Sequence, residues 1–306
     1  MEALLVNVIQ MAAPSLANFS KLQMTSFEVF DLPYIFQTMG DVHKVTMGSV
    51  GKELFKPLEY KGLKGLAYWD NDFKQLSLNE SIHGPASFLK KKIRIQDSTV
   101  LQSQMQSIGA IPVKLTFAEV VENLKAGTID GAENPVSNFY SKKMYEYQKS
   151  LALTNHGYLG YAVLTNLLFW NSLPTDIQGQ LTQAIDETTV YANKVASEKS
   201  RADLEAVRNL GFEVIVPTPE EKAAFKEAML SIHDSASAKI GTEVVSQVYE
   251  AVNFGAPAPV VAQKPVVAQK SVIAKTSEEG VAPVKVEKRK RVKKVVPQIS
   301  EDAVVK

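Results

Sequence analysis

The sequence predicts an α/β fold with two lobes joined by one long helix. Residues 91–134 alternate short strand-like and helix-like segments, and residues 172–210 keep an unbroken helical pattern after Pro174. A chain of 306 residues is also long enough that its hydrophobic core usually divides in two. We therefore expect a cleft between two lobes.

The first strand and helix of the alternating region surround Arg94. Ile93 and Ile95 flank this arginine in the apolar-polar-apolar order of a strand. Ser98 then suits the N-cap of a helix, because a serine oxygen accepts one of the first free N–H groups. Gly109 suits the end of the same helix, since glycine readily adopts the left-handed conformation found there.

A second strand and helix follow. Residues 113–115 form the next short apolar run, and Thr116 with Glu119 makes a capping box for a helix that Gly127 ends. One side of this helix is apolar: Val120, Val121 and Leu124. Asp130-Gly131 is then typical of a turn. Such strand-helix alternation predicts a mainly parallel sheet covered by helices.

The long helix and the segments after it complete the folded part. The pattern that opens at Ser172-Leu173-Pro174 runs to Leu210, which predicts a helix of about 35 residues, against a usual length of about 11–12. Such a helix would cross both lobes. Residues 212–216 predict a strand, and Thr218-Pro219-Glu220-Glu221 carries the signals of a helix start, so we expect a last helix that ends near Ala236.

Composition excludes several classes of protein. The chain has no cysteine, so disulfide scaffolds, thiol catalysis and cysteine-based zinc sites are excluded. No apolar run approaches the roughly 20 residues that span a bilayer, and residues 1–16 lack the basic start and long apolar stretch of an export signal. We therefore expect neither a transmembrane helix nor a signal peptide in the chain as written.

Residues 255–306 differ from the rest of the chain in charge and composition. They hold 11 basic and 5 acidic residues, whereas residues 1–254 hold 23 basic and 28 acidic residues. The hexapeptide PVVAQK occurs twice and there is no aromatic residue, so we predict a disordered basic tail. Its Lys/Arg cluster at 288–294 is compatible with weak polyanion binding, but a solvated charge cluster is the plainer interpretation, and no nucleic-acid partner is expected.

Known catalytic and metal-binding motifs are missing from the sequence. There is no Walker loop, GxSxG elbow, HExxH motif or GxGxxG after a strand, and residues 48–52 (GSVGK) lack the Walker spacing. Asp130 and Glu133 suit capping or solvated roles better than an acid/base pair. The four histidines stand singly: His43, His83, His156 and His233. We therefore expect no enzyme, no metal and no cofactor.

Three stretches together carry a family resemblance. They are KGLKGLAYWDNDFKQL at 61–76, KKIRIQDS at 91–98 and GTIDGAENPVSNFYSKKMYEYQKSLALTNHGYLGY at 127–161. In order and spacing they resemble the solute-binding subunits of tripartite ATP-independent periplasmic (TRAP) transporters of the dicarboxylate-binding type, over residues 1–254. The resemblance implies a periplasmic-binding-protein-like fold whose two α/β lobes close on an organic acid and deliver it to TRAP membrane permease subunits.

The resemblance also implies site residues. Arg94 matches the signature arginine that holds the ligand carboxylate through two parallel hydrogen bonds, although by pattern alone it would be an exposed strand residue. Asn134 matches an asparagine that also holds the carboxylate, and a turn residue before Pro135 is the alternative. Phe117 matches an aromatic residue that packs on the ligand, and core packing is the alternative.

Four further residues belong to this implied site. Trp69, Asn71 and Lys74 lie in the stretch that crosses between the lobes, and Tyr158 is expected to line the cleft. Lys74 stands where many relatives have arginine, and Ala132 replaces a glutamine that is common in the family. The identity of the ligand therefore stays open.

The resemblance gives lobe boundaries as well. Lobe one is expected to comprise residues 1–71 and 160–199, lobe two residues 72–159 and 200–254, and the tail residues 255–306. Family members begin with an export signal and a strand-helix-strand unit, whereas Met1 aligns close to the next helix. We therefore expect the first lobe to be incomplete, and the chain as written to fold poorly or bind weakly, because neighbouring strands would lack partners.

The leading hypothesis for function is the periplasmic subunit that captures a small organic acid, such as a C4-dicarboxylate, for a TRAP permease. One alternative is a truncated relative that no longer binds solute. A second alternative is an interaction protein that acts through its basic tail.

Overall fold

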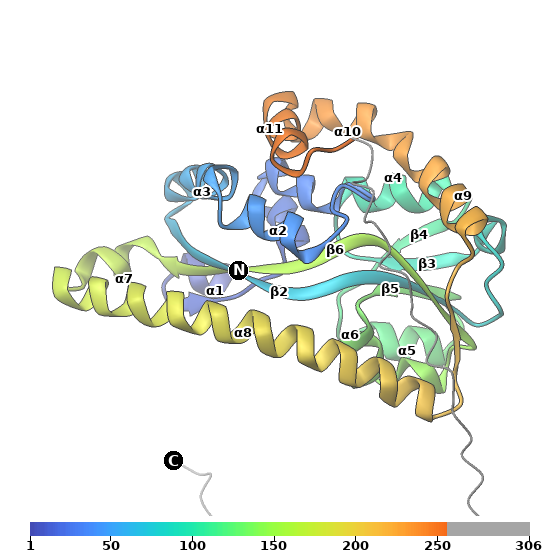
Figure 1. The fold of residues 1–306 in the computed structure, drawn as a ribbon. Coiled ribbons are helices and arrows are strands. Elements are labelled where there is room, and N and C mark those ends of the chain that lie inside the picture. Colours follow the sequence, from blue (N-terminus) through green and yellow to red (C-terminus); the bar gives the residue numbers. More distant parts are fainter. Residues whose placement is uncertain (256–306) are drawn as a thin grey trace, which may run out of the picture. The chain divides into compact units, whose positions relative to one another are not determined.

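A seven-stranded mixed sheet organises residues 1–255, the part of the chain that the computed structural model describes (Figure 1). The strand order is β1-β6-β2-β5-β3-β4, and β7 pairs with β6. The tail that the sequence predicts to be disordered lies outside the described residues, apart from Gly255.

The two longest strands lie side by side in this sheet. β2 (Leu63–Leu78) and β6 (Ser150–Asn166) are antiparallel along their length. β1 (Met11–Ala12) is antiparallel to β6, and β5 (Gly131–Asn134) is antiparallel to β2. The prediction of a mainly parallel sheet is therefore wrong for the longest strands. The alternating pattern used for that prediction covers only one end of the sheet, and pairing between strands so distant in sequence leaves no local signal.

The other end of the sheet has the predicted parallel pairing. β3 (Lys92–Ile95) is parallel to β4 (Ile111–Lys114) and to β5. On the other side of β2, β7 (Glu213–Ile215) is parallel to β6. Helix α4 (Thr99–Ser107) connects β3 with β4. Its predicted cap is confirmed, because the hydroxyl of Ser98 accepts a hydrogen bond from the N–H of Leu101 at 3.3 Å.

Helix α5 (Val120–Lys125) leads into β5. The predicted capping box of Thr116 and Glu119 is only half formed. The Glu119 carboxylate accepts the N–H of Thr116 at 2.8 Å, but Glu119 is itself the N-cap of α5 and its N–H donates to the carbonyl oxygen of Thr116. The predicted turn at Asp130-Gly131 is wrong, because Gly131 is the first residue of β5. A Cβ atom at Gly131 would lie 2.2 Å from the carbonyl oxygen of Ser77, so glycine here allows close approach of β5 to β2.

Helix α8 (Thr175–Asn209) has 35 residues, which confirms the predicted long helix. It lies along the sheet beside β2, from α7 (Leu167–Ser172) at one end toward α5 and α6 (Val136–Ser141) at the other (Figure 1). The helix therefore runs along the length of β2, from one end of that strand to the other.

Within the described part of the chain, three helices follow β7. α9 (Pro219–Leu230) starts with the predicted capping box of Thr218 and Glu221. The expected end of the last helix near Ala236 is wrong, since Ala236 lies inside α10 (Ile232–Ile240) and α11 (Thr242–Val252) follows. Buried residues of α10 and α11 pack with residues of the N-terminal part of the chain, and this tertiary packing stabilises helices that the local pattern did not indicate.

Short helical segments complete the architecture. The α-helices are α1 (Glu2–Leu5), α2 (Met39–Thr46) and α3 (Ser49–Phe55), and the 3-10 helices are η1 (Leu16–Leu22), η2 (Thr25–Asp31), η3 (Lys56–Lys61), η4 (Pro85–Phe88) and η5 (Met144–Glu146). Gly48 is the N-cap of α3, so the GSVGK stretch starts a helix.

Three hydrophobic clusters form the core of the described residues. The first joins the N-terminal helices with α10 and α11, the second surrounds β3, α4 and α9, and the third surrounds α5, β5 and α6. The boundaries given for the two lobes stay a prediction. Among residues 1–255, no helix combines the length and the apolar character needed to cross a bilayer.

Candidate functional site

A cavity of about 780 Å³ opens where β3 and β5 end, and residues of η1 form part of its wall. The segment 114–119 forms another part of its wall. Three of the seven site residues implied by the sequence line this cavity: Arg94, Phe117 and Asn134. Residues far apart in the sequence are thus brought to one place by the ends of two parallel strands.

Arg94 is the buried cation of the cavity. It is 3% exposed, so it is not the exposed strand residue that the pattern alone suggests. Its Nε donates a hydrogen bond to the carbonyl oxygen of Leu115 at 2.9 Å, which orients the guanidinium. Among residues 1–255, the two terminal nitrogens of Arg94 have no hydrogen-bond partner. Four N–H donors therefore remain for an anion.

Burial also affects the charge of Arg94. Desolvation lowers its pKa, and the carboxylates of Glu133 and Glu119 oppose that change. The ordinary arginine pKa is so far above neutrality that the guanidinium stays protonated. A permanent cation with little solvent around it attracts an anion more strongly than a solvated one does.

Asn134 and Phe117 lie near Arg94 in the cavity wall. Asn134 is the last residue of β5 and is 3% exposed, so it is a strand residue and not part of a turn. Its Oδ1 has no hydrogen-bond partner among residues 1–255, and its Nδ2 contacts only the sulfur of Met144 at 3.8 Å. The ring of Phe117 packs on the third core cluster. It also makes a cation–π contact with the ammonium of Lys142, which lies 4.9 Å from the ring centroid.

Asn71 reaches the cavity through its neighbours. Its Nδ2 donates to the hydroxyl of Tyr161 at 2.7 Å and to Oδ1 of Asn138 at 3.2 Å, and both partners line the cavity. Ser137 donates its hydroxyl to Oδ1 of Asn71 at 2.8 Å. Asn71 thus holds two wall residues in place rather than lining the wall itself.

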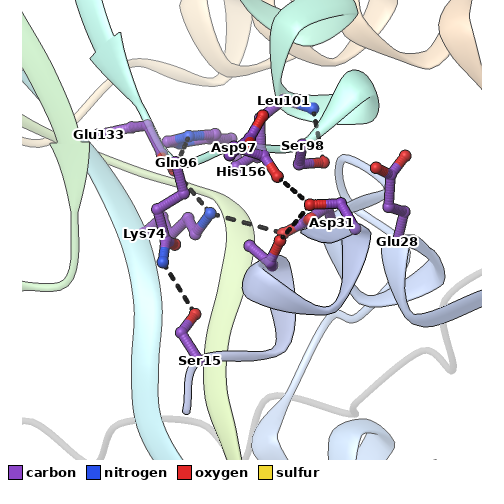
Figure 2. Close-up of polar contacts among 12 residues, drawn as sticks. Ser15, Glu28, Asp31, Lys74, Gln96, Asp97, Ser98, Leu101, Glu133 and His156 are labelled. Carbon is purple, nitrogen blue, oxygen red and sulfur yellow. Dashed lines mark hydrogen bonds and ion pairs between the residues drawn. The ribbon is translucent and has the colours of Figure 1, made fainter. Parts of the chain in front are cut away.

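Lys74 lies in a buried ionic cluster, outside the lining of the cavity. Its ammonium is 2.9 Å from Oε2 of Glu133 and 3.7 Å from Oδ1 of Asp31, and all three side chains are almost fully buried. Figure 2 shows these side chains meeting between the strands and η2. Glu133 is therefore a buried ion-pair partner, which corrects the expectation of a capping or solvated role.

Two groups in this cluster have strongly shifted pKa values. Burial raises the pKa of Asp31 to about 6, against the opposing attraction of Lys74 and a hydrogen bond from Ser98. Burial, together with the positive charge of Lys74, lowers the pKa of His156 to about 3. His156 is thus neutral at pH 7, and its Nδ1 shares a 2.7 Å hydrogen bond with the hydroxyl of Thr154.

Trp69 and Tyr158 do not line the cavity. The indole N–H of Trp69 donates to the hydroxyl of Thr189 on α8 at 3.0 Å. The hydroxyl of Tyr158 donates to Oδ1 of Asp70 at 2.7 Å, and its ring packs in the first core cluster. Trp69 therefore links β2 to α8, and Tyr158 links β6 to β2.

Several cavity residues were missed by the sequence analysis. They are Ser15, Asn18, Lys21, Gln96, Asn138 and Tyr161. Gln96 had a usable signal, because it lies two residues after Arg94 and therefore on the same side of an extended segment. For η1 no comparable local signal existed, since its position beside the end of β3 is set by tertiary packing.

The cavity has the chemistry of an anion site. A buried guanidinium, a buried amide and an aromatic ring line one wall, and arginine matches the planar geometry of a carboxylate. Among the residues that the structure describes, no three His, Asp or Glu side chains gather in a way that would hold a metal ion.

Comparison with known proteins identifies the family. The model of the bacterial extracellular solute-binding protein family 7 matches residues 1–239. The C4-dicarboxylate-binding periplasmic protein DctP of Rhodobacter capsulatus is 46% identical over 252 residues, which is 82% of this chain and 76% of that protein.

Solved structures give the same result. A TRAP periplasmic solute-binding protein from Shewanella oneidensis with bound succinate is 35% identical, with a TM-score of 0.79 over 82% of each chain. A TRAP periplasmic solute-binding protein from Pseudomonas aeruginosa with bound L-malate is 32% identical, with a TM-score of 0.74 over 76% of this chain and 82% of the other. The likeness confirms the two-lobed α/β fold class. This chain therefore belongs to the DctP family of TRAP transporter solute-binding proteins.

Proposed function

We propose that this protein captures a small organic acid, and specifically a C4-dicarboxylate, for a TRAP membrane permease in the periplasm. The observation that carries the proposal is the guanidinium of Arg94, which is 3% exposed, lines the cavity and is oriented by Leu115. A guanidinium held in this way can donate hydrogen bonds to both oxygens of one carboxylate with little loss of side-chain entropy.

Relatives support the choice of ligand class. The Rhodobacter capsulatus relative is named for C4-dicarboxylate binding, and the two structural neighbours hold succinate and L-malate. The cavity offers donors suited to such ligands, namely Arg94, Asn134 and the hydroxyl of Tyr161. Periplasmic location, delivery to a permease and the absence of catalysis are proposed on the same family basis.

Isothermal titration calorimetry tests the role of Arg94. The chain is titrated with succinate, L-malate and an uncharged diol of similar length, and Arg94→Gln is compared with Arg201→Gln. Arg201 is an exposed arginine of α8, so it is a matched control. We expect Arg94→Gln to weaken succinate binding by roughly 30-fold or more, since removing one partner of a buried charge pair typically costs about 2–5 kcal/mol.

These titrations, together with a heparin-binding measurement, decide between this proposal and its alternatives. Equal affinities of Arg94→Gln and Arg201→Gln for succinate would remove Arg94 from the site. A well-folded chain that binds none of the acids would favour the non-binding relative. An interaction protein acting through the tail would bind a polyanion such as heparin only while residues 256–306 are present.

A further inference from the structure

Phe117 lines the cavity from a segment whose backbone is fixed on both sides. This segment connects β4 with α5. The carbonyl oxygen of Leu115 accepts from Nε of Arg94 at 2.9 Å, and the N–H of Leu115 donates to the last carbonyl group of β3 at 3.3 Å. Glu119 closes the segment, because its carboxylate accepts the N–H and the hydroxyl of Thr116. With the backbone held, the direction of the Phe117 ring depends on the contacts of its side chain.

One of these contacts is a cation over the ring. The ammonium of Lys142 lies 4.9 Å from the ring centroid of Phe117, within the range of a cation–π contact. Lys142 is half-buried, so water shields this contact only in part. Among residues 1–255, the Lys142 ammonium forms no ion pair within 4 Å. The charge of Lys142 is thus directed at the aromatic ring and not at a carboxylate.

Helix α6 links Lys142 to the cavity. The helix starts directly after Asn134 and Pro135, and Lys142 is its C-cap. Asn134 and Asn138 of this stretch line the cavity. Phe139 is fully buried in the third core cluster, which α6 shares with α5, the helix beside it (Figure 1). Because α6 is packed in this way, it holds Lys142 at a set position relative to the cavity wall.

A ring that already has its binding orientation costs less to order. An aromatic side chain that is free to turn loses that freedom when a ligand packs on it, and this loss weakens binding. A cation over one face of the ring removes part of the freedom before the ligand arrives, since the ring quadrupole attracts it. The packing of Phe117 on the third core cluster restricts the ring as well, but only where it meets the core.

We propose that Lys142 is a positioning residue for the ligand: its ammonium holds the Phe117 ring at the cavity wall and thereby strengthens binding of the acid. Lys142 is not part of the cavity lining, so it acts through Phe117. This inference rests on the proposed function, since it presupposes that an acid binds at Arg94. It adds a residue outside the cavity that sets the affinity.

A double-mutant cycle tests the contact between the two side chains. Calorimetry gives the dissociation constant of succinate for the wild-type chain, Lys142→Met, Phe117→Leu and the double variant. Lys143→Met is the matched control, because it removes the same charge from the next residue, which is exposed. Lys142→Arg is the conservative variant, since a guanidinium also binds the face of an aromatic ring.

We expect Lys142→Met to weaken succinate binding about threefold to fivefold, as a partly exposed cation–π contact implies. Lys142→Arg and Lys143→Met should keep the affinity of the wild-type chain. In the Phe117→Leu background, Lys142→Met should have no further effect, because the ammonium then has no aromatic ring to contact. Equal melting temperatures of Lys142→Met and Lys143→Met would show that the loss of affinity is not a loss of fold.

Failure of this inference differs from failure of the proposed function. A loss in Lys142→Met that persists in the Phe117→Leu background would assign the effect to long-range attraction and overturn the positioning role. Wild-type affinity in Lys142→Met, or an equal loss in Lys143→Met, would also overturn it while leaving Arg94 in its role. No binding of succinate or L-malate to the wild-type chain would overturn both proposals.

Discussion

Lys74 shows how one buried side chain is held by charge. Its ammonium lies within 4 Å of carboxylate oxygens of both Glu133 and Asp31, and these three residues have almost no contact with solvent. A buried ion pair adds little net stability when complete, but removing one partner leaves an uncompensated charge. Lys74, which the sequence analysis expected to contact the ligand, is instead the buried counterion of Glu133 and Asp31.

Substitution of Lys74 by methionine tests whether its charge stabilises the buried cluster. Lys74→Met keeps most of the side-chain volume but leaves two buried carboxylates without their cation. We expect the free energy of unfolding at pH 7.5 to fall by about 3–5 kcal/mol, as measured by urea denaturation. The exposed-site control Lys226→Met should change it by less than about 1 kcal/mol. A similar small change in Lys74→Met would mean that Lys74 does not stabilise the cluster.

The pH dependence of stability reports on Asp31 and His156. The folded-state pKa of Asp31 is raised to about 6, so its contribution is fully present below pH 4 and is lost as pH rises toward 6. The folded-state pKa of His156 is lowered to about 3, so its contribution is present above pH 6.5 and is lost as pH falls toward 3. The two residues therefore act in opposite directions.

Asp31→Asn should remove only the first of these effects. Because the variant has no carboxylate to ionise at this position, its stability relative to the wild-type chain should rise by up to about 3 kcal/mol between pH 4 and pH 6. Unfolding curves at several pH values within that interval measure the difference. Asp186→Asn, at an exposed position of α8, is the control and should give a constant difference. A constant difference for Asp31→Asn would show that Asp31 is already ionised at pH 4.

At the scale of elements, helix α8 is tethered to the central strand at defined points. The N–H of Asp70 donates to Oδ1 of Asn193 at 2.9 Å, and Trp69 donates to Thr189. The tether at Asp70 coincides with an irregularity in the β2–β6 pairing between Asp70 and Asp72. A β-bulge leaves backbone groups of the ladder unpaired, so a side chain from α8 satisfies one of them here.

Removing this tether should cost stability. Asn193→Ala leaves the N–H of Asp70 without its partner, and we expect a loss of about 1–3 kcal/mol in the free energy of unfolding. Asn209→Ala at the exposed end of the same helix controls for the change in helix propensity. Equal effects of the two substitutions in urea denaturation would mean that water or a shifted side chain replaces Asn193.

At the scale of the whole molecule, the three core clusters consist of residues 4–248 with partly buried neighbours up to Phe254. The sequence predicts a disordered tail after these residues, since residues 255–306 hold no aromatic residue. The predicted tail is expected to be dispensable for the fold and for binding at the cavity.

Deletion of residues 256–306 tests this expectation. The shortened chain should keep its melting temperature within about 2 °C and its affinity for succinate within about twofold, because a change of 1 kcal/mol moves the midpoint of such a chain by only about 2–4 °C. Differential scanning calorimetry and ligand titration provide the two measurements. A fall of many degrees would show that the tail packs on the rest of the molecule.

Local signals in the sequence were enough to predict many elements and part of the site. Ser98, Thr218 and Pro219 marked helix starts that the structure confirms, and the unbroken pattern after Pro174 predicted α8. Such signals are local because caps and helical periodicity depend on neighbours within one or two turns. Arg94, Phe117 and Asn134 came from motifs, and the structure brings these three together in one cavity.

Tertiary structure decided what local patterns do not encode. The antiparallel pairing of β2 with β6 joins segments far apart in sequence, and it directs Tyr158 to Asp70 and Trp69 to α8 instead of into the cavity. Lys74 was expected to contact the ligand, but in the structure it is the buried counterion of Glu133. Burial and neighbouring charges decide which partner a charged side chain has, and a local sequence pattern shows neither. By itself, the sequence determined the family, the caps, the long helix and the three cavity residues. The packing of η1 against the end of β3 determined which further polar side chains line the cavity with Arg94, because that contact depends on the whole sheet being assembled.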